Sequence, residues 1–596
     1  MKEFFKMLLA VVCGLFITGF IVFFLFSSMI AAFSLSGSSE PALPKSGVLL
    51  MDMSELEVSE QASPAAPLAM VQGNAAPSIG IWQTVQAINA AAADPSVKYI
   101  YLKSDGFAAD YAMAEEIRKS LENFRQSGKP VISYIENPTT ESYYLSSVAD
   151  KIYMTSNPGG NPTVLGVGSQ LIFLKDILDR LGVNVQLIRH GKYKSAGEMY
   201  VRSESSKENL EQNQAMVDAI WANISKGITG SREISAEQLD AALDELKLNL
   251  PQDFLELGFV DELLSTDELR NKLADLAVVD DYSDLQFISL ADYAAAKVLP
   301  DYKAKNKIAV IYADGEITIG SDRAQVAGDR FANIISKVRK DDSIKAVVLR
   351  VNSPGGSVIA ADKIKDELDL LKAEKPLVAS YGGYAASGGY WISANCEHIF
   401  SDAGTLTGSI GVFSMIPEFS KTVKNLAHVN ITTVKSHEHA DMYTLMRPFD
   451  ERELQVQQTL VDDIYSSFVS NVSEGRKLDP DYVDSIAQGR VWTGSEALEI
   501  GLVDEIGTLE DAIRYTVALV SGSGSGSLDG WRVEEYPRPV SQMESLLEMF
   551  GAGSTGNEAF AGTAFEGVAG AMEGFLRDSR DGNYVLARMP YAIELN

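Results

Sequence analysis

The stretch Asp341-Asp342-Ser343-Ile344-Lys345-Ala346-Val347-Val348-Leu349-Arg350 decides the fold of this chain, because the chain contains it twice. Its counterpart is Asp94-Pro95-Ser96-Val97-Lys98-Tyr99-Ile100-Tyr101-Leu102-Lys103, which aligns without a gap at an offset of 247 residues (341 − 94). Both copies enter a continuous apolar run, as is typical of a strand in a buried parallel sheet. The spacing is far longer than the ~20–50 residues of a solenoid repeat, so it predicts a duplicated domain.

The residues after each copy repeat as well. A helix-like stretch follows over 112–126 in the first copy and over 358–373 in the second, and a Lys-Pro pair then leads into another strand in each. Strand, helix and strand in this order predict right-handed βαβ units and an α/β fold.

The N-terminus predicts a membrane anchor. Lys2 and Lys6 precede an apolar run from residue 7 to about residue 33, and a helix needs ~20 residues to cross a bilayer. A cleavable signal peptide has a shorter apolar run of about 7–15 residues. We therefore expect an uncleaved single-pass helix in the inner (plasma) membrane, with its lysines in the cytoplasm and the rest of the chain outside. Cleavage near Ala31-Ala32 is the alternative.

The 596 residues are too many for a single core. We expect four parts: an anchor and spacer over 1–40, a first α/β repeat over 41–300, a second over 301–520, and a Ser-Gly linker with a tail over 521–596. Apolar segments near 543–550 and 560–576 suggest either marginal helices in a flexible tail or amphipathic helices for a partner or the membrane.

Charge and cysteine content narrow the class of protein. With 51 basic and 81 acidic residues the net charge is −30, which argues against a nucleic-acid partner. Cys13 lies in the apolar N-terminal run, so no structural disulfide with Cys396 is expected.

A serine among small residues is a candidate nucleophile, in Tyr384-Ala385-Ala386-Ser387-Gly388-Gly389-Tyr390. Some 30 residues earlier, Asn352-Ser353-Pro354-Gly355-Gly356-Ser357 forms a second glycine turn between a predicted strand and helix. Such turns suit a nucleophile and an oxyanion pocket, since glycine supplies the backbone freedom that they require. In the first copy, the position opposite Ser387 is approximately Thr140, and no glycines surround it.

A serine nucleophile needs a proton acceptor, either a histidine or a lysine whose pKa burial has lowered. None of the five histidines has a distinctive setting, and His437-Glu438-His439 lacks a third metal ligand, so we expect an exposed loop there and no metal. The first copy instead carries Gly191-Lys192-Tyr193-Lys194-Ser195 after a predicted strand over 183–188, whereas the aligned part of the second copy has no lysine. The serine and the lysine thus stand in opposite copies. A Lys-Tyr-Lys segment by itself is most often surface.

In combination these motifs, with Leu406-Thr407-Gly408-Ser409-Ile410-Gly411, resemble the signal peptide peptidase A (protease IV) family in its long, duplicated, membrane-anchored form. The resemblance runs from the anchor to about residue 540. It implies two tandem Clp/crotonase-like repeats behind an N-terminal transmembrane helix, and a homotetramer with hydrophobic substrate grooves.

The resemblance also implies the site residues. Ser387 matches the nucleophile and Lys194 the general base, whereas Lys192 is not at the matching position. Ser409 matches the serine that orients the lysine. The oxyanion donors would be the N–H groups of Gly388 and of Gly355 or Gly356, each worth on the order of 3 kcal/mol.

The function implied is that of a membrane-anchored serine endopeptidase that degrades cleaved signal peptides and other hydrophobic peptides, with no metal or organic cofactor. Two alternatives remain, a general envelope quality-control protease and a catalytically silent scaffold that binds hydrophobic peptides. A crotonase-type acyl-CoA enzyme would share the fold, but CoA is not expected outside the cytoplasm.

Overall fold

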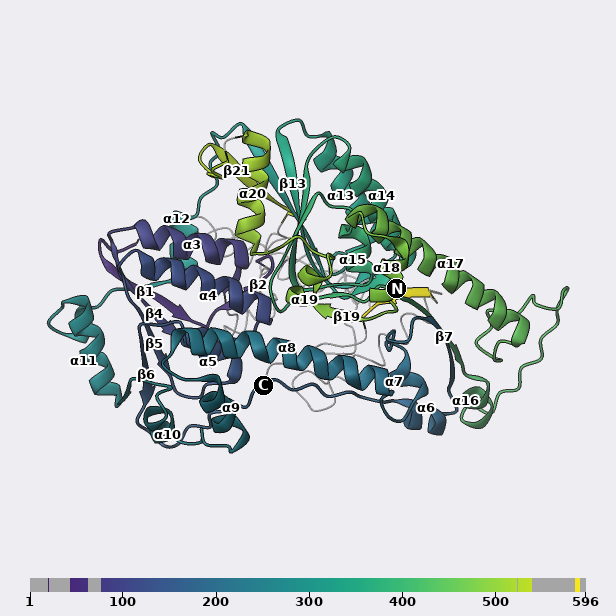
Figure 1. The fold of residues 1–596 in the computed structure, drawn as a ribbon, viewed down its shortest axis with the longest axis horizontal. Coiled ribbons are helices and arrows are strands. Elements are labelled where there is room, and N and C mark those ends of the chain that lie inside the picture. The colour runs from purple at the N-terminus through teal and green to yellow at the C-terminus, as the bar shows by residue number, and fades with distance from the viewer. Residues whose placement is uncertain (1–19, 21–42, 63–76, 523, 539–584, 590–596) are drawn as a thin grey trace, which may run out of the picture.

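A computed structural model describes residues 20, 43–62, 77–522, 524–538 and 585–589 of the chain (Figure 1). The expected anchor lies outside the described residues apart from Phe20, and so do the apolar segments near 543–550 and 560–576. Within the described ranges, no helix has both the length and the apolar content needed to span a membrane.

The first α/β unit is built on a six-stranded sheet with the order β8-β6-β5-β4-β1-β9, in which all pairs are parallel. Its strands are β1 (Gly47–Asp52), β4 (Val97–Lys103), β5 (Val131–Ile135), β6 (Lys151–Thr155), β8 (Glu262–Leu264) and β9 (Phe287–Ser289). Alternate residues of β4 enter different cores: Ile100 and Leu102 face one side, and Tyr99 and Tyr101 face the other. The sheet is therefore covered on both faces, as the apolar runs predict.

Helices cover the two faces of this sheet. On one face lie α3 (Ile81–Ala93), α4 (Tyr111–Gln126) and α5 (Thr140–Ser146), and on the other lies α11 (Thr266–Ala277). Apart from β7, which belongs to the third sheet described below, the remaining elements of this half are β2 (Glu57–Ser59), β3 (Ser78–Gly80), α6 (Lys175–Leu181), α7 (Glu198–Val201), α8 (Lys207–Ser231), α9 (Ala236–Asp244), α10 (Pro251–Glu256), the 3₁₀ helix η1 (Tyr282–Asp284) and α12 (Leu290–Lys297).

The second unit repeats the plan in an eight-stranded sheet. Its main order is β19-β17-β15-β13-β10-β21, with β16 paired to β15 and β20 to β16. The strands are β10 (Asn306–Asp314), β13 (Ile344–Ser353), β15 (Leu377–Ala386), β16 (His398–Ser401), β17 (Leu406–Gly408), β19 (Val491–Thr493), β20 (Glu505–Ile506) and β21 (Trp531–Tyr536). The order β10-β13-β15-β16 matches β1-β4-β5-β6, which confirms the predicted duplication.

One core joins the two units. Val348 of β13 belongs to the same buried cluster as Ile100 of β4, together with Ile513 of α20 (Leu509–Ser521). On its other face the second sheet is covered by α13 (Gly328–Lys340), α14 (Val358–Lys372) and α15 (Gly388–Ser393). Strand β21, which follows the Ser-Gly segment, closes the sheet edge by pairing in parallel with β10. The division of the chain at residues 40, 300 and 520 stays a prediction.

A third sheet combines strands from distant parts of the chain, in the order β12-β11-β14-β22-β18-β7. Its strands are β7 (Asn184–His190), β11 (Ile317–Thr318), β12 (Val326–Ala327), β14 (Gly355–Ser357), β18 (Val412–Glu418) and β22 (Val585–Arg588). The antiparallel pairing of β7 with β18 carries the loop that follows β7 into the second half of the molecule.

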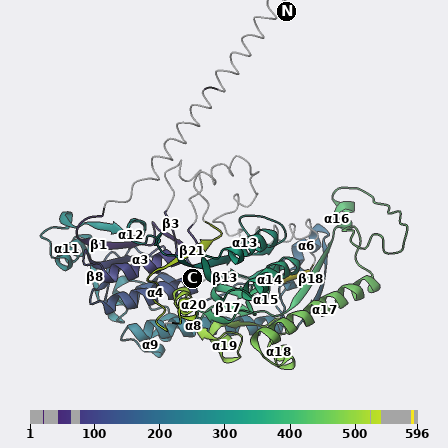
Figure 2. The ribbon, with the colours of Figure 1, turned by 90° about the horizontal axis from the view of Figure 1, so that it is seen from above.

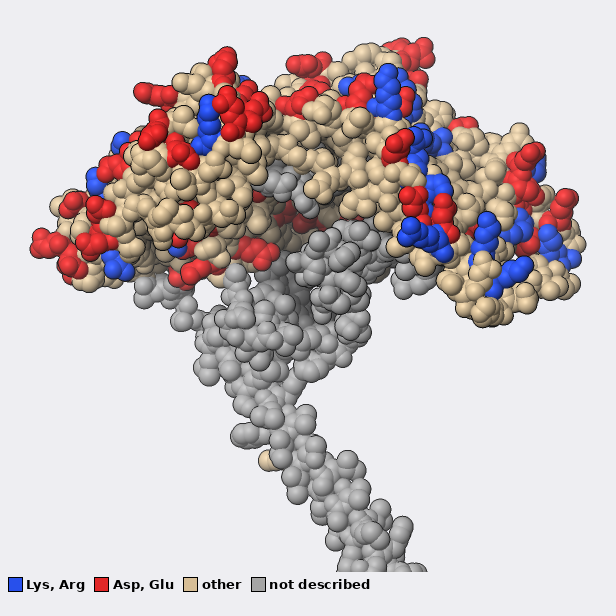
Figure 3. Space-filling view, turned by 90° about the horizontal axis from the view of Figure 1, so that it is seen from below, with Lys and Arg blue, Asp and Glu red and all other residues tan. Residues whose placement is uncertain are grey.

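Long helices extend along the molecule (Figures 1 and 2). Helix α8 runs from beneath the first sheet toward α7, and Gln212 on it accepts a hydrogen bond from the N–H of Val491 at 2.9 Å. Helix α17 (Glu451–Arg476) projects at the opposite end from α11, where the short helix α16 (Ser420–Asn425) also lies. Helix α18 (Pro480–Ile486) packs on α17, and α19 (Gly494–Glu499) lies nearer the middle of the molecule, beside β19. The face drawn in Figure 3 is largely acidic toward one end, and basic and acidic side chains interleave toward the other.

Candidate active site

Ser387 stands at the junction of β15 and α15, in a strained backbone conformation. Its φ is +56° and its ψ is −112°, a region that a residue with a Cβ rarely adopts. Its N–H donates to the carbonyl of Gly408 at 2.8 Å and its own carbonyl accepts from Trp391 at 2.8 Å, so the turn is fixed on both sides. A Cβ at the next-but-one residue, Gly389, would lie 2.7 Å from the carbonyl oxygen of Ser353. Close packing therefore requires a residue without a side chain at position 389.

Lys194 reaches this serine from the first half of the chain. Its Nζ lies 2.8 Å from Oγ of Ser387, and 3.0 Å from both Oγ and the carbonyl oxygen of Ser409. The pairing of β7 with β18 delivers the loop that carries it. A Cβ at Gly489 would lie 2.6 Å from Cβ of Lys194, and one at Gly411 would lie 3.1 Å from its Cδ. Because Gly489 and Gly411 have no side chains, they leave open the channel that the Lys194 side chain fills.

Burial sets the protonation of this lysine. Lys194 is 1 % exposed, and desolvation lowers its pKa well below the usual 10.5. No carboxylate is among the groups that shift this pKa. A neutral amine has one lone pair to accept the proton of Ser387 and two N–H groups, which match the two oxygens of Ser409. The geometry therefore supports transfer of a proton from the serine hydroxyl to the amine.

Ser409 is also held rigidly. It is fully buried, its φ is +48°, and its N–H donates to the carbonyl of Arg490 at 2.7 Å. The backbone of Ser409 is thus fixed by contacts that do not involve Lys194. This is the arrangement expected of a residue that orients the lysine.

The three predicted oxyanion glycines lie together. Gly355 and Gly356 have φ of +97° and +154°, in the range where residues with a Cβ are strained. A Cβ at Gly355 would lie 2.6 Å from the backbone nitrogen of Gly388, and a Cβ at Gly388 would lie 3.1 Å from that of Gly356. The N–H groups of the two turns are therefore close enough to serve one oxygen atom.

The first copy has a structural contact where the second has its serine. Thr140 begins helix α5, and its Oγ1 accepts hydrogen bonds from the N–H groups of Leu165 at 3.0 Å and Gly166 at 2.9 Å. Its hydroxyl oxygen thus fixes a loop, and the duplication has kept the nucleophile geometry in one copy.

The histidines have other partners. His190 contacts Asp462 at 2.7 Å and stacks on Tyr465, and His398 lies 3.2 Å from Glu505. No hydrogen bond between a histidine and Ser387 occurs in the described structure, in which all the histidines are placed.

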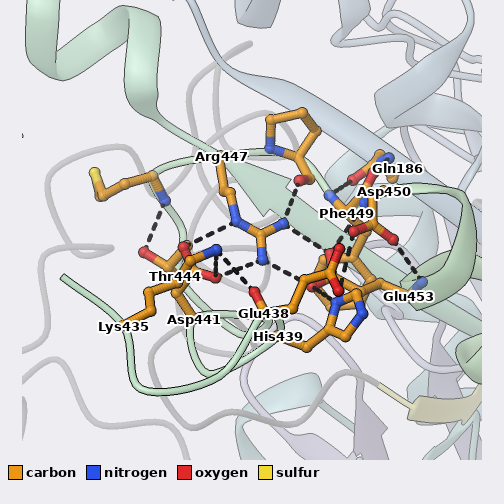
Figure 4. A network of polar contacts seen from close by, with 12 residues as sticks. Gln186, Lys435, Glu438, His439, Asp441, Thr444, Arg447, Phe449, Asp450 and Glu453 are labelled. Carbon is orange, nitrogen blue, oxygen red and sulfur yellow. Dashed lines mark hydrogen bonds and ion pairs between the residues drawn. The ribbon is translucent and has the colours of Figure 1, made fainter. Parts of the chain in front are cut away.

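His439, Asp450 and Glu453 bring three possible metal-ligand atoms within 4.8 Å of one another. Arg447 already supplies positive charge there, since its guanidinium contacts Glu453 and Asp441, each at 2.7 Å (Figure 4). Hydrogen bonds from Arg447 lower the pKa of Glu453 to about 2. The cluster is thus an internally neutralised network that holds the loop against the N-terminus of α17.

Sequence reasoning missed two parts of this site. Gly489 lines the lysine channel, but nothing in the sequence around Gln488-Gly489 distinguishes it from an ordinary turn. Strand β22 lies beside the oxyanion glycines, and its only sequence signal is a short apolar stretch at 585–587.

Comparison with known proteins finds two matching family models. Peptidase family S49 matches residues 123–280 and 369–521, and Clp protease matches residues 301–399. Protease 4 of Haemophilus influenzae is 34% identical over 547 residues, which cover 89% of this chain and 88% of that protein. The chloroplastic serine protease SPPA of Arabidopsis thaliana is 28% identical over 82% of this chain and 73% of its own. A putative signal peptide peptidase SppA of Enterococcus faecium is 38% identical over 34% of this chain and 59% of its own.

Proposed function

This chain belongs to peptidase family S49 and is a serine-type protease, and on that premise we propose that Ser387 and Lys194 are its catalytic dyad. The observation that carries the proposal is the 2.8 Å contact between Nζ of a buried lysine and Oγ of a strained serine. Each half of the duplicated chain contributes one member of the dyad.

In the proposed mechanism, Oγ of Ser387 attacks the carbonyl carbon of a peptide bond while Lys194 takes the hydroxyl proton. N–H groups of Gly388 and of Gly355 or Gly356 stabilise the resulting oxyanion. The lysine then gives its proton to the leaving amine, and the ester is hydrolysed by water that Lys194 activates in turn. Ser409 keeps Nζ directed toward Ser387 throughout.

The substrate class is also a proposal. We propose that the enzyme degrades cleaved signal peptides and other hydrophobic peptides, a role in keeping with the name of the Enterococcus faecium relative. The single-pass anchor, the extracytoplasmic position of the catalytic part and the homotetramer, all expected from the sequence, belong to the same proposal.

The test compares three variants in the hydrolysis of an apolar peptide. We expect Ser387→Ala and Lys194→Ala to lower kcat by at least about 10³-fold, since each removes a reacting group. Lys192→Ala is the matched control, because Lys192 is exposed and contacts the ring of Tyr193, and it should keep its activity. Full activity in Lys194→Ala would exclude the dyad, and a folded parent without hydrolysis would favour the peptide-binding scaffold.

The pH dependence gives a second readout. A lysine base works only when neutral, so kcat/KM should fall as the pH drops through the pKa of Lys194. Because burial lowers this pKa, the limb should lie well below 10.5. A limb at the usual lysine pKa would contradict the role assigned to Lys194.

A further inference from the structure

Strand β15 contains a bulge shortly before the proposed nucleophile. It pairs in parallel with β13, and Val351 is opposite Tyr381, but the next pair is Ser353 with Ala385. A single residue of β13, Asn352, therefore stands opposite three residues of β15. Bulges are rare between parallel strands, and beside active sites they redirect a side chain. In the first copy, β4 and β5 pair without a shift of register, so the bulge belongs to the copy that holds the serine.

The side chain of Asn352 fills the gap that the bulge leaves in the ladder. Its amide oxygen accepts a hydrogen bond from the N–H of Tyr384 at 3.1 Å, and its amide nitrogen donates to Oδ1 of Asp314 at 3.0 Å. A backbone N–H can only donate and a carboxylate can only accept, whereas a carboxamide has both a donor and an acceptor. The backbone of Asn352 is held as well, because its carbonyl accepts from the N–H of Gly315 at 2.9 Å.

Two glycines make the bulge possible. A Cβ at Gly382 would lie 3.2 Å from Cβ of Asn352, and one at Gly383 would lie 2.8 Å from Cγ of Asp110, a residue of the first half. The hydroxyl of Thr405 donates to the carbonyl of Gly382 at 2.7 Å and so fixes the bulge from the next strand segment. The bulge is therefore a well-packed part of the structure, and Asn352 is the residue of β13 that holds it.

Asn352 also joins the two glycine turns of the site. It is the first residue of the turn that carries the oxyanion glycines, and Tyr384 is the first residue of the stretch that carries Ser387. Between Tyr384 and Ser387 lie only Ala385 and Ala386, both fully buried. A shift of the strand at Tyr384 would therefore move the serine relative to the oxyanion glycines.

We propose that Asn352 is a positioning residue for the peptidase reaction, which fixes the strand of the nucleophile against the oxyanion turn by bridging Asp314 and Tyr384. The inference rests on the proposed dyad, because the serine that it positions is Ser387. Asn352 acts through the backbone of the two turns, so its substitution should lower kcat and kcat/KM together and leave KM nearly unchanged.

The experiment exchanges the amide and the carboxylate. Asn352→Asp keeps an acceptor for Tyr384 but places a second carboxylate against Asp314, and kcat for an apolar peptide should fall by about 10²-fold, the usual effect of a ~1 Å misplacement. The double variant Asn352→Asp/Asp314→Asn restores the donor and the acceptor in reversed order, and it should regain at least about tenfold of that loss. Desolvation and the charge of Glu60 raise the pKa of Asp314 to about 7, so the assays are run above this pH.

Asn89→Asp is the matched control. Asn89 of α3 donates to Glu510 of α20 at 2.9 Å, which is again an amide–carboxylate hydrogen bond between distant parts of the chain, but outside the site. This variant should lose stability without a comparable loss of kcat. Ser387→Ala is assayed alongside, and thermal unfolding shows whether each variant is folded.

Three outcomes would overturn the inference. Equal kcat in Asn352→Asp and Asn89→Asp would show that the bridge does not position the serine, and would leave the proposed function standing. A loss in Asn352→Asp that Asp314→Asn does not relieve would mean that the bond to Asp314 is not what Asn352 supplies. Hydrolysis that persists in Ser387→Ala would remove the dyad itself, and the inference with it.

Discussion

At the scale of single residues, the site depends on an amine that is kept out of water. Lys194 is buried among the hydroxyls of Ser387 and Ser409, and the cost of burying a charge there favours the neutral form. The sequence distinguishes Lys194 from the neighbouring Lys192 only through the resemblance to a family. The physical difference, one side chain buried and the other exposed, is set by residues nearly 300 positions away, such as Gly489.

The lowered pKa has a consequence for stability. Between the pKa of Lys194 in the fold and 10.5, the unfolded chain binds a proton that the folded chain does not, so the free energy of unfolding rises with pH. In that window the wild type should gain up to about 1.4 kcal/mol per pH unit relative to Lys194→Met. Urea unfolding at several pH values measures this difference. Lys192→Met, at an exposed lysine, is the control variant, and a flat difference for Lys194→Met would mean that the buried amine stays charged.

At the scale of elements, the strand–helix–strand pattern of each copy could be predicted, and the pairing between copies could not. The predicted helices over 112–126 and 358–373 correspond to α4 and α14, because apolar periodicity and Lys-Pro boundaries are local signals. The pairing of β7 with β18 joins segments more than 220 residues apart, and no local pattern specifies such a partner. The position of Lys194, the proposed base, depends on that pairing.

Substitution of Gly489 tests whether Lys194 depends on the channel that this pairing creates. Gly489 and Gly501 have nearly equal φ, +79° and +78°, but an added Cβ would meet Lys194 at 2.6 Å in the first case and only Leu478 at 3.6 Å in the second. Both alanine variants should lose about 1 kcal/mol or more of stability from the strained φ. Only Gly489→Ala should also displace Lys194, and a shift of ~1 Å at a reacting group costs about 10²-fold in rate.

Unfolding curves and kcat for the two variants separate these effects. Equal kcat in Gly489→Ala and Gly501→Ala would show that the lysine does not depend on the channel.

At the scale of the whole molecule, the two copies act as one body because their interface is part of the core. The duplication and the α/β class follow from the repeated apolar runs. The interface could not be predicted, since it depends on which faces of two similar sheets meet. One clue lay within the repeat itself: the repeated stretch that ends in Lys103 in the first copy ends in Arg350 in the second. Lys103 is partly exposed beside Asp52, whereas Arg350 is fully buried.

Arg350 joins the two halves through charge. From β13 it contacts Glu60 at 2.8 and 2.9 Å and Glu116 of α4 at 2.8 Å, and both carboxylates are 1 % exposed. The guanidinium also donates to Ser380 Oγ at 3.0 Å and to the carbonyl of Tyr381 at 2.9 Å. Removal of the arginine would leave two acidic groups of the first half buried against the second without a counter-charge.

We therefore expect Arg350→Ala to lower the free energy of unfolding by about 3–5 kcal/mol, the usual cost of breaking a buried ion pair from one side. The loss should grow as the pH rises, because a buried Glu116 carboxyl without its counter-charge is easier to accommodate when protonated. Lys363→Ala is the control, since Lys363 pairs with Asp329 at 2.7 Å on the surface with both side chains 47% exposed, and such pairs contribute at most about 1 kcal/mol. Calorimetry at two pH values makes the comparison. If Arg350→Ala melted like Lys363→Ala, this charge cluster would not stabilise the contact between the two halves, and the lysine of one half would meet the serine of the other without its help.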